Sequence, residues 1–415
     1  MENPKIRFKG FTKDWEQRKF GELYSKVSEK NDLSFGADKI ISVANMYFKE
    51  EVKESSDEYM RTYNVMRLGD IAFEGNKSKN YSHGRFVENT IGDGIVSHVF
   101  DVFRPTTSYD LLFWKYLINN EGVMGRIMAR CTNASTMMTN LVASDFLKEK
   151  ILVPSLKEQK KIGAYFDSLD HLITLHQRKC DQTKNLKKYM LQKMFPQNGA
   201  KVPEIRFDGY TYDWEQRKLG ELVKEGILEA PLDGNHGEKH PTSDEYVDSG
   251  IPFLMASDIH NGEVNIYSCK YITKERAERL DKGFARNGDV LLTHKATIGE
   301  TAILSNLMTE YAMLTPQVTY YRIKNEERLN REYLYSFFNS LDFQTELKTK
   351  AAQSTRPYIG ITAQQNLKII LPAEIDEQIR IGLYFRNLDH LITLHQRKCD
   401  ELKKMKKYML QNMFI

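Results

Sequence analysis

Four short polar stretches hold the residues whose types and spacing are best suited to chemistry. The first, GNKSKNYSHGR at residues 75–85, carries two lysines, a histidine and an arginine but no acid. Lysine and arginine bind phosphate oxygens, and asparagine and arginine can also read the edges of adenine and guanine. The stretch is a candidate nucleic-acid contact, although a solvated basic loop would explain it equally well. Its candidate contact residues are Lys77, Lys79, Asn80, Tyr81, His83 and Arg85.

The other three stretches mix hydroxyl, amide and basic groups. NASTMMTN at residues 133–140 could contact phosphates or base edges, but such residues are usually turn chemistry. THKATIG at residues 293–299 and QSTRPY at residues 353–358 occupy matching places in the second half of the chain. The candidate contacts here are Ser135, Thr136, Asn140, His294, Lys295, Thr297, Ser354, Thr355, Arg356 and Tyr358.

Motifs of catalysis are absent from the sequence. There is no NPPY-like or DPPY-like tetrad, no glycine-rich adenosylmethionine loop after a strand and no GxxxxGK[ST] phosphate loop. The four cysteines form no CxxC pair, so we expect neither a zinc site nor a disulfide framework, which fits a reducing cytoplasm. We expect no cofactor and no metal to be bound by this chain.

Charge and hydropathy restrict the possible partners. The net charge of +4 is small, so any nucleic-acid contact must come from local clusters rather than from bulk charge. No run of 18 apolar residues exists, and the start MENPKIRFKG lacks an apolar signal core. We therefore expect no membrane segment and no export, and a cytoplasmic location.

The elements that must position these stretches are set by an internal repeat. LDHLITLHQRKCD occurs at residues 169–181 and again, letter for letter, at residues 388–400. Each copy lies in a longer similar segment whose heptad pattern predicts a helix of about 38 residues, or ~57 Å. The opening segment IRFKGFTKDWEQRKFGEL at residues 6–23 also returns, as IRFDGYTYDWEQRKLGEL at residues 205–222. Each opening segment contains a tryptophan that could touch DNA or anchor the segment by packing, namely Trp15 or Trp214.

Between the repeated segments lie two regions that share little sequence but have the same strand-and-turn pattern and one shorter helical stretch. The predicted fold class is α+β, with two globular domains separated by two long helices that form an antiparallel coiled coil with pseudo-twofold symmetry. The predicted domains are 1–155 and 205–373 for the globules, 156–196 and 374–415 for the helices, and 197–204 for the linker.

The heptad pattern predicts a seam between the two long helices. His176 and His395 fall on this seam, where they could bind a metal, act as a pH switch or, more simply, form a hydrogen-bonded pair that fixes the register. The predicted seam residues are Ile162, Leu169, Leu172, His176, Leu186, Met190, Ile381, Leu388, Leu391, His395, Leu402 and Met409.

The outer positions of both helices are also alike, which predicts equivalent docking surfaces for a partner. The end of a coiled coil is the alternative explanation for the similar tails KKYMLQKMF and KKYMLQNMF. The candidate docking residues are Arg178, Lys187, Lys188, Tyr189, Arg397, Lys406, Lys407 and Tyr408.

The order of variable region, helix, variable region, helix resembles the DNA-specificity subunit of a type I restriction–modification enzyme. Three phrases carry the resemblance: DWEQRKFGEL, LDHLITLHQRK and QSTRPYIGITAQQNLKIILPAEIDEQIRI at residues 353–381. Arg356 lies in the last of these phrases, which makes it the strongest single candidate contact.

The resemblance implies that the chain itself is not catalytic. One globule would read each half of a split, asymmetric site in double-stranded DNA, and the helices would set the spacing. The helices would also bind two methyltransferase subunits and, through them, the restriction subunits. S-adenosylmethionine, ATP and Mg²⁺ would belong to those partners. The alternatives are a methyltransferase or nuclease with its own recognition domains, which the missing motifs disfavour, and a coiled-coil scaffold that binds only proteins.

Overall fold

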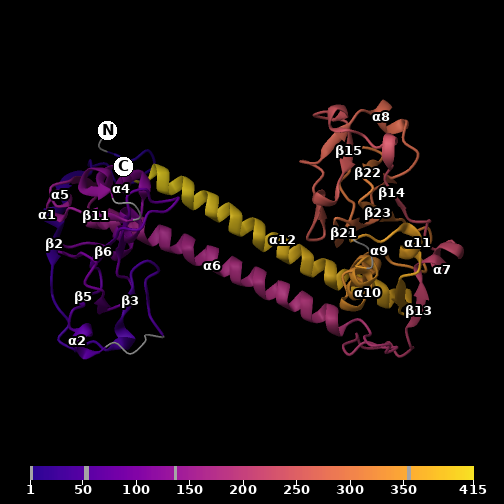
Figure 1. The fold of residues 1–415 in the computed structure, drawn as a ribbon, viewed down its shortest axis with the longest axis horizontal. Coiled ribbons are helices and arrows are strands. Elements are labelled where there is room, and N and C mark those ends of the chain that lie inside the picture. Colours follow the sequence, from indigo (N-terminus) through magenta and orange to yellow (C-terminus); the bar gives the residue numbers. More distant parts are fainter. Residues whose placement is uncertain (1–2, 51–55, 135–137, 353–356) are drawn as a thin grey trace. The chain divides into compact units, whose positions relative to one another are not determined.

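Short apolar runs pair into strands in each half of the sequence, and a long helix follows each set of strands (Figure 1). The computed structural model describes residues 3–50, 56–134, 138–352 and 357–415. It consists of two compact units: unit 1 is Met1–Gln177 with Arg397–Ile415, and unit 2 is Arg178–Gln396. Each unit contains one globule, half of helix α6 (Leu156–Lys193) and half of helix α12 (Ile375–Asn412). The mixed helix-and-strand fold in two repeats is as the sequence predicts, although the compact units divide each long helix near its middle.

Unit 1 is built on a four-stranded antiparallel sheet in the order β2-β9-β6-β7. Alternate strand residues point to opposite faces, so Ile71 and Phe73 join the core beneath the helices, whereas Ala72 joins a second, smaller core. Both faces of this sheet are therefore buried. The elements are β2 (Tyr24–Val27), β9 (Val102–Pro105), β6 (Ile71–Glu74), β7 (Arg85–Glu88), α3 (Leu111–Ile118) and α4 (Glu121–Cys131).

Unit 2 repeats this plan with the order β14-β23-β20-β21, and a second four-stranded sheet, β18-β15-β22-β19, is added to it. Val290 and Leu292 face the helices, whereas Leu291 faces the second core. The elements are β14 (Leu232–Asp233), β23 (Val318–Tyr321), β20 (Val290–Lys295), β21 (Thr297–Ile303), α9 (Arg331–Phe338), α10 (Leu341–Ala351), β18 (Lys270–Ile272), β15 (Ile251–Leu254), β22 (Ala312–Leu314) and β19 (Phe284–Ala285).

Smaller elements complete both units. They are α1 (Phe20–Leu23), β3 (Ile41–Ser42), β4 (Tyr47–Phe48), α2 (Asp57–Met60), β5 (Asn64–Met66), β8 (Gly94–Val96), β10 (Thr132–Ala134), β11 (Thr139–Leu141), α5 (Ala143–Phe146), α7 (Leu219–Lys224), β16 (Ile259–His260), β17 (Glu263–Val264), α8 (Lys274–Glu278) and α11 (Ile361–Gln365). No helix in the part of the chain that the structure describes combines the length and apolarity needed to cross a membrane.

The repeated opening segments attach each globule to its long helix. Strand β1 (Glu16–Lys19) pairs antiparallel with β12 (Lys150–Val153), and β13 (Glu215–Lys218) pairs in the same way with β24 (Lys368–Leu371). The tryptophan before each opening strand is buried, Trp15 to 2% exposure and Trp214 to 3%, against an aromatic residue of α3 or α9. Both tryptophans are thus packing anchors, which removes them as candidates for direct DNA contact.

The two long helices contact each other within each unit. In unit 1, Phe166 of α6 stacks on Phe414 beyond α12, with 5.6 Å between ring centroids, and Cys399 Sγ donates to Ile173 O at 3.9 Å. In unit 2, Phe195 stacks on Phe385 at 5.7 Å, and Cys180 Sγ donates to Ile392 O at 3.8 Å. Later residues of α6 meet earlier residues of α12, so the paired helix halves run in opposite directions within each unit.

The predicted seam has two alternating sets of positions, and only the first set lies on the buried face of the helices. Ile162, Leu169, Ile381, Leu388 and Leu402 are buried, and the predicted residues His176, Met190, His395 and Met409 are half-buried. The second set of predicted seam residues is wrong, because Leu172, Leu186 and Leu391 are 40%, 45% and 41% exposed. The inward positions lie one residue later, at Phe166, Ile173, Cys180, Lys187 and Met194 in α6 and just beyond it, and at Phe385, Ile392, Cys399, Lys406 and Met413 in the second copy.

Candidate nucleic-acid interface

In unit 1 the two predicted contact stretches lie against each other. Asn76 forms an isolated bridge with Met138, and the amide of Thr139 donates to Gly75 O at 2.8 Å. Gly75 and Gly84 permit this approach, because a Cβ at either position would collide with a backbone oxygen, that of Thr139 or of Glu74. The connection from β6 to β7 and the β10–β11 hairpin thus form one surface, which we call recognition surface 1 (residues 76–83 and 138–140).

Most of the predicted contact residues of recognition surface 1 are accessible. Lys77, Lys79, Asn80 and Asn140 are exposed, and Tyr81 and His83 are half-buried. Amide, phenol, imidazole and ammonium groups together can bind both phosphates and base edges in DNA. The predicted contacts Ser135 and Thr136 lie outside the described residues.

Arg85 has structural contacts within unit 1. Its side chain is 23% exposed, Nε donates to Glu74 Oε2 at 2.9 Å, and its guanidinium lies 5.0 Å from the centroid of the Tyr81 ring. Because Nε serves a carboxylate and Nη2 donates to Ala44 O, Arg85 cannot offer these two donors to a guanine edge without breaking existing bonds. In this structure Arg85 holds Tyr81 and the end of the loop in place, and its role as a DNA contact stays a prediction.

Unit 2 brings the matching stretches together in the same way. Lys295 forms an isolated bridge with Tyr358, as Asn76 does with Met138 in unit 1. Lys295 lies 219 positions after Asn76, and Tyr358 lies 220 positions after Met138. The Lys295 ammonium lies 6.0 Å from the centroid of the Tyr358 ring, and Thr297 is exposed beside it. We call this recognition surface 2 (residues 295–297 and 357–358). Strands β20 and β21 are linked by a single residue, Ala296, at φ 68°. This turn is therefore much shorter than the connection between β6 and β7 in unit 1. The predicted contacts Ser354, Thr355 and Arg356 lie outside the described residues.

His294 is the clearest correction among the candidate contacts. Its side chain is 0% exposed, so it cannot touch DNA at the surface. Its Nδ1 lies 3.0 Å from Ile359 O and the amide of Ile359 donates to His294 O at 3.1 Å, which together tie strand β20 to the segment after residue 357. Burial lowers the pKa of His294, and its buried Nε2 has no hydrogen-bond partner among the residues that the structure describes. His294 therefore supports recognition surface 2 from below.

The same region contains polar residues that sequence reasoning missed. Asp233 is buried, and its carboxylate accepts from His236 Nε2 at 2.7 Å and from Lys282. Oδ2 of Asp233 also lies 3.9 Å from Nε2 of His294. His236 is 48% exposed and Lys282 is 32% exposed, so both can contact a ligand. The turn DGNHG resembles the other polar loops, but its pairing with a lysine 49 positions away cannot be seen in the sequence.

The predicted docking residues of the helices fall into two groups. Arg178, Lys188, Tyr189, Arg397, Lys407 and Tyr408 are exposed. Lys187 and Lys406 point inward and form ion pairs, with Asp389 at 2.5 Å and with Asp170 at 2.6 Å. These two lysines are only 17% and 25% exposed, so their assignment to partner docking is corrected to a contact between the helices.

The outer helix face is instead marked by large apolar side chains. Each copy of the repeat exposes them at equivalent positions, Leu172, Leu175, Leu186 and Tyr189 in α6 and Leu391, Leu394, Met405 and Tyr408 in α12. Their exposure runs from 36% for Leu175 to 57% for Tyr408. Apolar side chains in a regular row on a solvent-facing helix are typical of a surface that a partner covers. We call these eight residues the outer rows.

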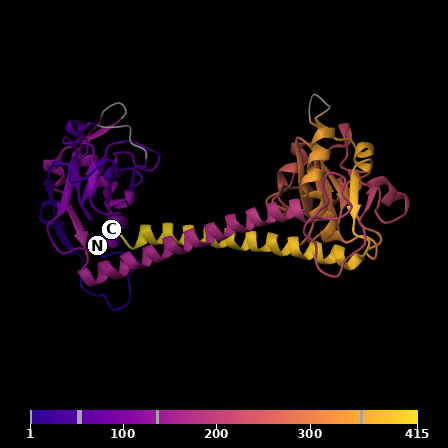
Figure 2. The same cartoon turned by 90° about the horizontal axis from the view of Figure 1, so that it is seen from below.

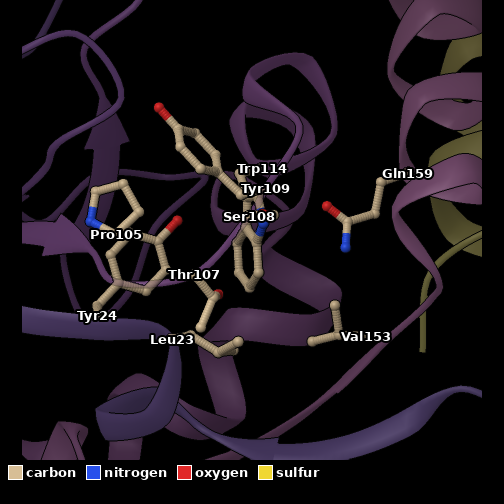
Figure 3. A pocket seen from close by; sticks show the side chains of 9 residues that line it. All are labelled: Leu23, Tyr24, Pro105, Thr107, Ser108, Tyr109, Trp114, Val153 and Gln159. Carbon is tan, nitrogen blue, oxygen red and sulfur yellow. The ribbon is translucent and has the colours of Figure 1, made fainter.

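The pocket beside the core of unit 1 does not have the lining of an active site. The pocket in Figure 3 lies in unit 1 between Tyr24, Tyr109 and Trp114, and none of its nine lining residues is a carboxylate, histidine, cysteine, lysine or arginine. Among the described residues, no three His, Cys, Asp or Glu side chains are placed to hold a metal ion.

Comparison with known proteins agrees with the internal repeat. The model of the type I restriction modification DNA specificity domain matches twice, at residues 12–185 and 212–404. The MjaVIII specificity subunit of Methanocaldococcus jannaschii is 25% identical over 270 residues, which are 63% of this chain and 60% of that protein. The EcoBI specificity subunit of Escherichia coli is 24% identical over 277 residues, 62% of this chain and 55% of that protein. The chain thus matches somewhat more than half the length of these two relatives.

A solved structure has the same fold along the whole chain. The S subunit of a type I restriction–modification system from M. genitalium superposes with a TM-score of 0.62 and covers 100% of this chain and 99% of its own, at 13% sequence identity. At that identity the likeness concerns the fold alone.

Proposed function

Because the chain belongs to the family of type I restriction–modification DNA specificity subunits, which are non-catalytic, we propose that it reads a bipartite site in double-stranded DNA. Unit 1 reads one half of the site and unit 2 reads the other. The observation that carries this proposal is the pair of recognition surfaces, built from the same two connections of the same fold about 219 positions apart.

The two surfaces differ in the chemistry that they offer, which supports an asymmetric target. Recognition surface 1 includes most of the ten-residue connection between β6 and β7, with lysine, asparagine and tyrosine. Recognition surface 2 includes instead a one-residue turn between β20 and β21, flanked by lysine and threonine. Different donors and acceptors select different base edges in the major groove. Two half-sites of different sequence follow from two diverged surfaces on one fold.

The long helices set the distance between the half-sites in this proposal. Their halves pair in opposite directions within each unit, as an antiparallel coiled coil would require. A helix pair of fixed length acts as a spacer, because helices resist stretching and each residue adds ~1.5 Å. Half-sites that are one duplex turn apart would be ~34–36 Å from each other.

The outer rows and the exposed basic residues around them bind two methyltransferase subunits, one for each copy of the repeat. Equivalent apolar side chains in both helices support two equivalent docking surfaces. Restriction subunits join through the methyltransferases, and S-adenosylmethionine, ATP and Mg²⁺ are bound by those partners.

Mapping methylated adenines in cells that carry this chain with its partner genes tests the proposal. We expect one asymmetric sequence in two parts, separated by a spacer of constant length. A single uninterrupted motif would contradict the bipartite reading, and the absence of any DNA preference in the assembled complex would favour a protein scaffold.

A further inference from the structure

One carboxylate in unit 1 joins three elements that are far apart in the sequence. The hydroxyl of Tyr116, from helix α3 of the globule, donates to Asp170 Oδ2 of α6 at 2.7 Å. The ammonium of Lys406, from α12, donates to Asp170 Oδ1 at 2.6 Å and lies 5.1 Å from the centroid of the Tyr116 ring. The globule and both long helices therefore meet at Asp170.

Unit 2 contains the same arrangement. Tyr335 of α9 donates to Asp389 Oδ2 at 2.9 Å, and Lys187 of α6 donates to Asp389 Oδ1 at 2.5 Å. The Lys187 ammonium lies 5.6 Å from the centroid of the Tyr335 ring. Tyr335 and Asp389 follow their counterparts in unit 1 by 219 positions, and Lys187 precedes its counterpart Lys406 by the same number. The tyrosine is notable because it lies in a region where the two globules otherwise share little sequence.

The geometry of these clusters is directional, unlike the apolar packing around them. Each carboxylate gives one oxygen to the globule and the other to the second helix, and hydrogen bonds to a charged group weaken steeply with misalignment. The clusters are also partly shielded from water, since Tyr116 and Tyr335 are each 5% exposed and the two lysines are 25% and 17% exposed. Burial and the bond to the aspartate raise the pKa of both tyrosines, so each keeps the proton that it donates.

The buried aromatic rings beside each cluster already hold the long helices together. Stability alone therefore does not explain why a polar cluster is present. Phe166 and Phe414 stack in unit 1, and Phe195 and Phe385 stack in unit 2. Stacked rings tolerate small shifts and rotations, whereas a carboxylate with two fixed partners does not. Partly buried polar groups of this kind are known to fix the register of paired helices.

We propose that the clusters Tyr116–Asp170–Lys406 and Tyr335–Asp389–Lys187 are positioning joints that lock each recognition domain at one orientation on the helix pair. This inference rests on the proposed function, because the orientation matters by fixing how many base pairs separate the two half-sites. The six residues do not touch DNA; they act through the domains that they hold.

The test uses the full chain assembled with its methyltransferase partners and a set of duplexes with both half-sites and spacers of varied length. For Lys406→Met we expect the preference for the correct spacer over one that is a base pair longer or shorter to fall about tenfold, as the loss of a coupled network commonly produces. The half-site sequences remain unchanged. Lys406→Arg keeps the ion pair and should retain the preference, and Lys403→Met removes an exposed lysine of the same helix as a matched control.

Tyr116→Phe and Tyr335→Phe each remove a single oxygen atom. They provide the same test of the clusters if the lysine variant fails to fold. A sharp, unchanged spacer preference in folded Tyr116→Phe and Lys406→Met complexes would overturn the inference, as would a loss of half-site sequence preference in the same variants. The wild-type complex in the same assay distinguishes a failure of the proposed function from a failure of the joints alone. If it shows no split site at all, the proposed function fails; if it shows a split site that the variants leave unchanged, only the joints fail.

Discussion

At the scale of single residues, burial keeps two ionisable groups uncharged, one in each unit. Glu88 is 2% exposed, and burial, together with the nearby Asp110 carboxylate, raises its pKa to about 9. Burial lowers the pKa of His294. The two groups have opposite consequences: the Glu88 contribution to stability declines as pH rises, and the His294 contribution declines as pH falls below the ordinary pKa of histidine.

Replacing Glu88 with glutamine tests this directly. In the unfolded chain the carboxyl ionises near pH 4.5, whereas in the folded protein it stays protonated until about pH 9, so ionisation favours unfolding across this window. We expect Glu88→Gln to raise the free energy of unfolding at pH 8 by about 1–3 kcal/mol. The gain should be lost near pH 4.5. Thermal unfolding of both proteins at pH 5 and pH 8 measures it, and an equal shift at both pH values would contradict the assignment.

The exposed lysines of the recognition surfaces are expected to act as phosphate contacts. Lys79→Ala should weaken binding to all DNA sequences alike and lower the slope of log K against log salt by about 0.9, because one fewer counterion is released. Lys295→Ala should do the same from the other unit. Titrations at several salt concentrations check this, and an unchanged slope would remove the residue from the interface.

The candidate site could be read only partly from the sequence at this scale. The polar loops were visible because glycine, asparagine and lysine cluster in them, and the structure brings them together in pairs. The contacts that individual side chains make could not be predicted. Arg85 binds Glu74, His294 packs under Ile359, and Asp233 gathers His236 and Lys282, all through contacts that the order of residues does not reveal.

At the scale of elements, the long helices show why a heptad pattern is ambiguous. The length of each helix and one set of inward positions follow from the sequence, because Ile162, Leu169 and their counterparts recur every seven residues. The second set was missed because apolar residues also recur one position earlier, at Leu172 and Leu186, where they lie on the outside. The inward positions beside these two leucines hold Ile173 and Lys187. The apolar period alone cannot tell a helix–helix seam from a second face that is kept for a partner.

Two leucines of α12 can be used to test the difference between the helix–helix seam and the outer face. Leu388 is 6% exposed and Leu391 is 41% exposed, so the same substitution should act in different ways. Leu388→Ala should cost about 2–5 kcal/mol of stability, because it leaves a cavity in the core. Leu391→Ala should change stability by less than about 0.5 kcal/mol but weaken methyltransferase binding by more than about 1 kcal/mol. Thermal unfolding and a titration with the methyltransferase subunit measure the two effects; destabilisation by Leu391→Ala would place that residue in the core after all.

At the scale of the whole molecule, the chain is two copies of one plan. The amide of Ile6 donates to Asn412 O at 2.9 Å, and the amide of Ile205 donates to Lys193 O at the same distance. Arg7 pairs with Glu158, and Arg206 pairs with Glu377, each at 2.6 or 2.7 Å. The first opening segment therefore docks on the end of α12 as the second opening segment docks on the end of α6. Both chain ends lie close together in unit 1 (Figures 1 and 2). The sequence repeats predicted this plan, because the shared segments must make the same contacts twice.

The central claim is that each unit reads its own half of a split DNA site. Replacing residues 24–153 with the corresponding region of another family member changes recognition surface 1 and leaves unit 2 and the repeated segments intact. Sequencing of adenine methylation in cells that carry the hybrid chain and its partners then reports the target directly. We predict that one half of the methylated site changes, while the other half and the spacer stay as in the wild type. A change in both halves, or in neither, would contradict the account.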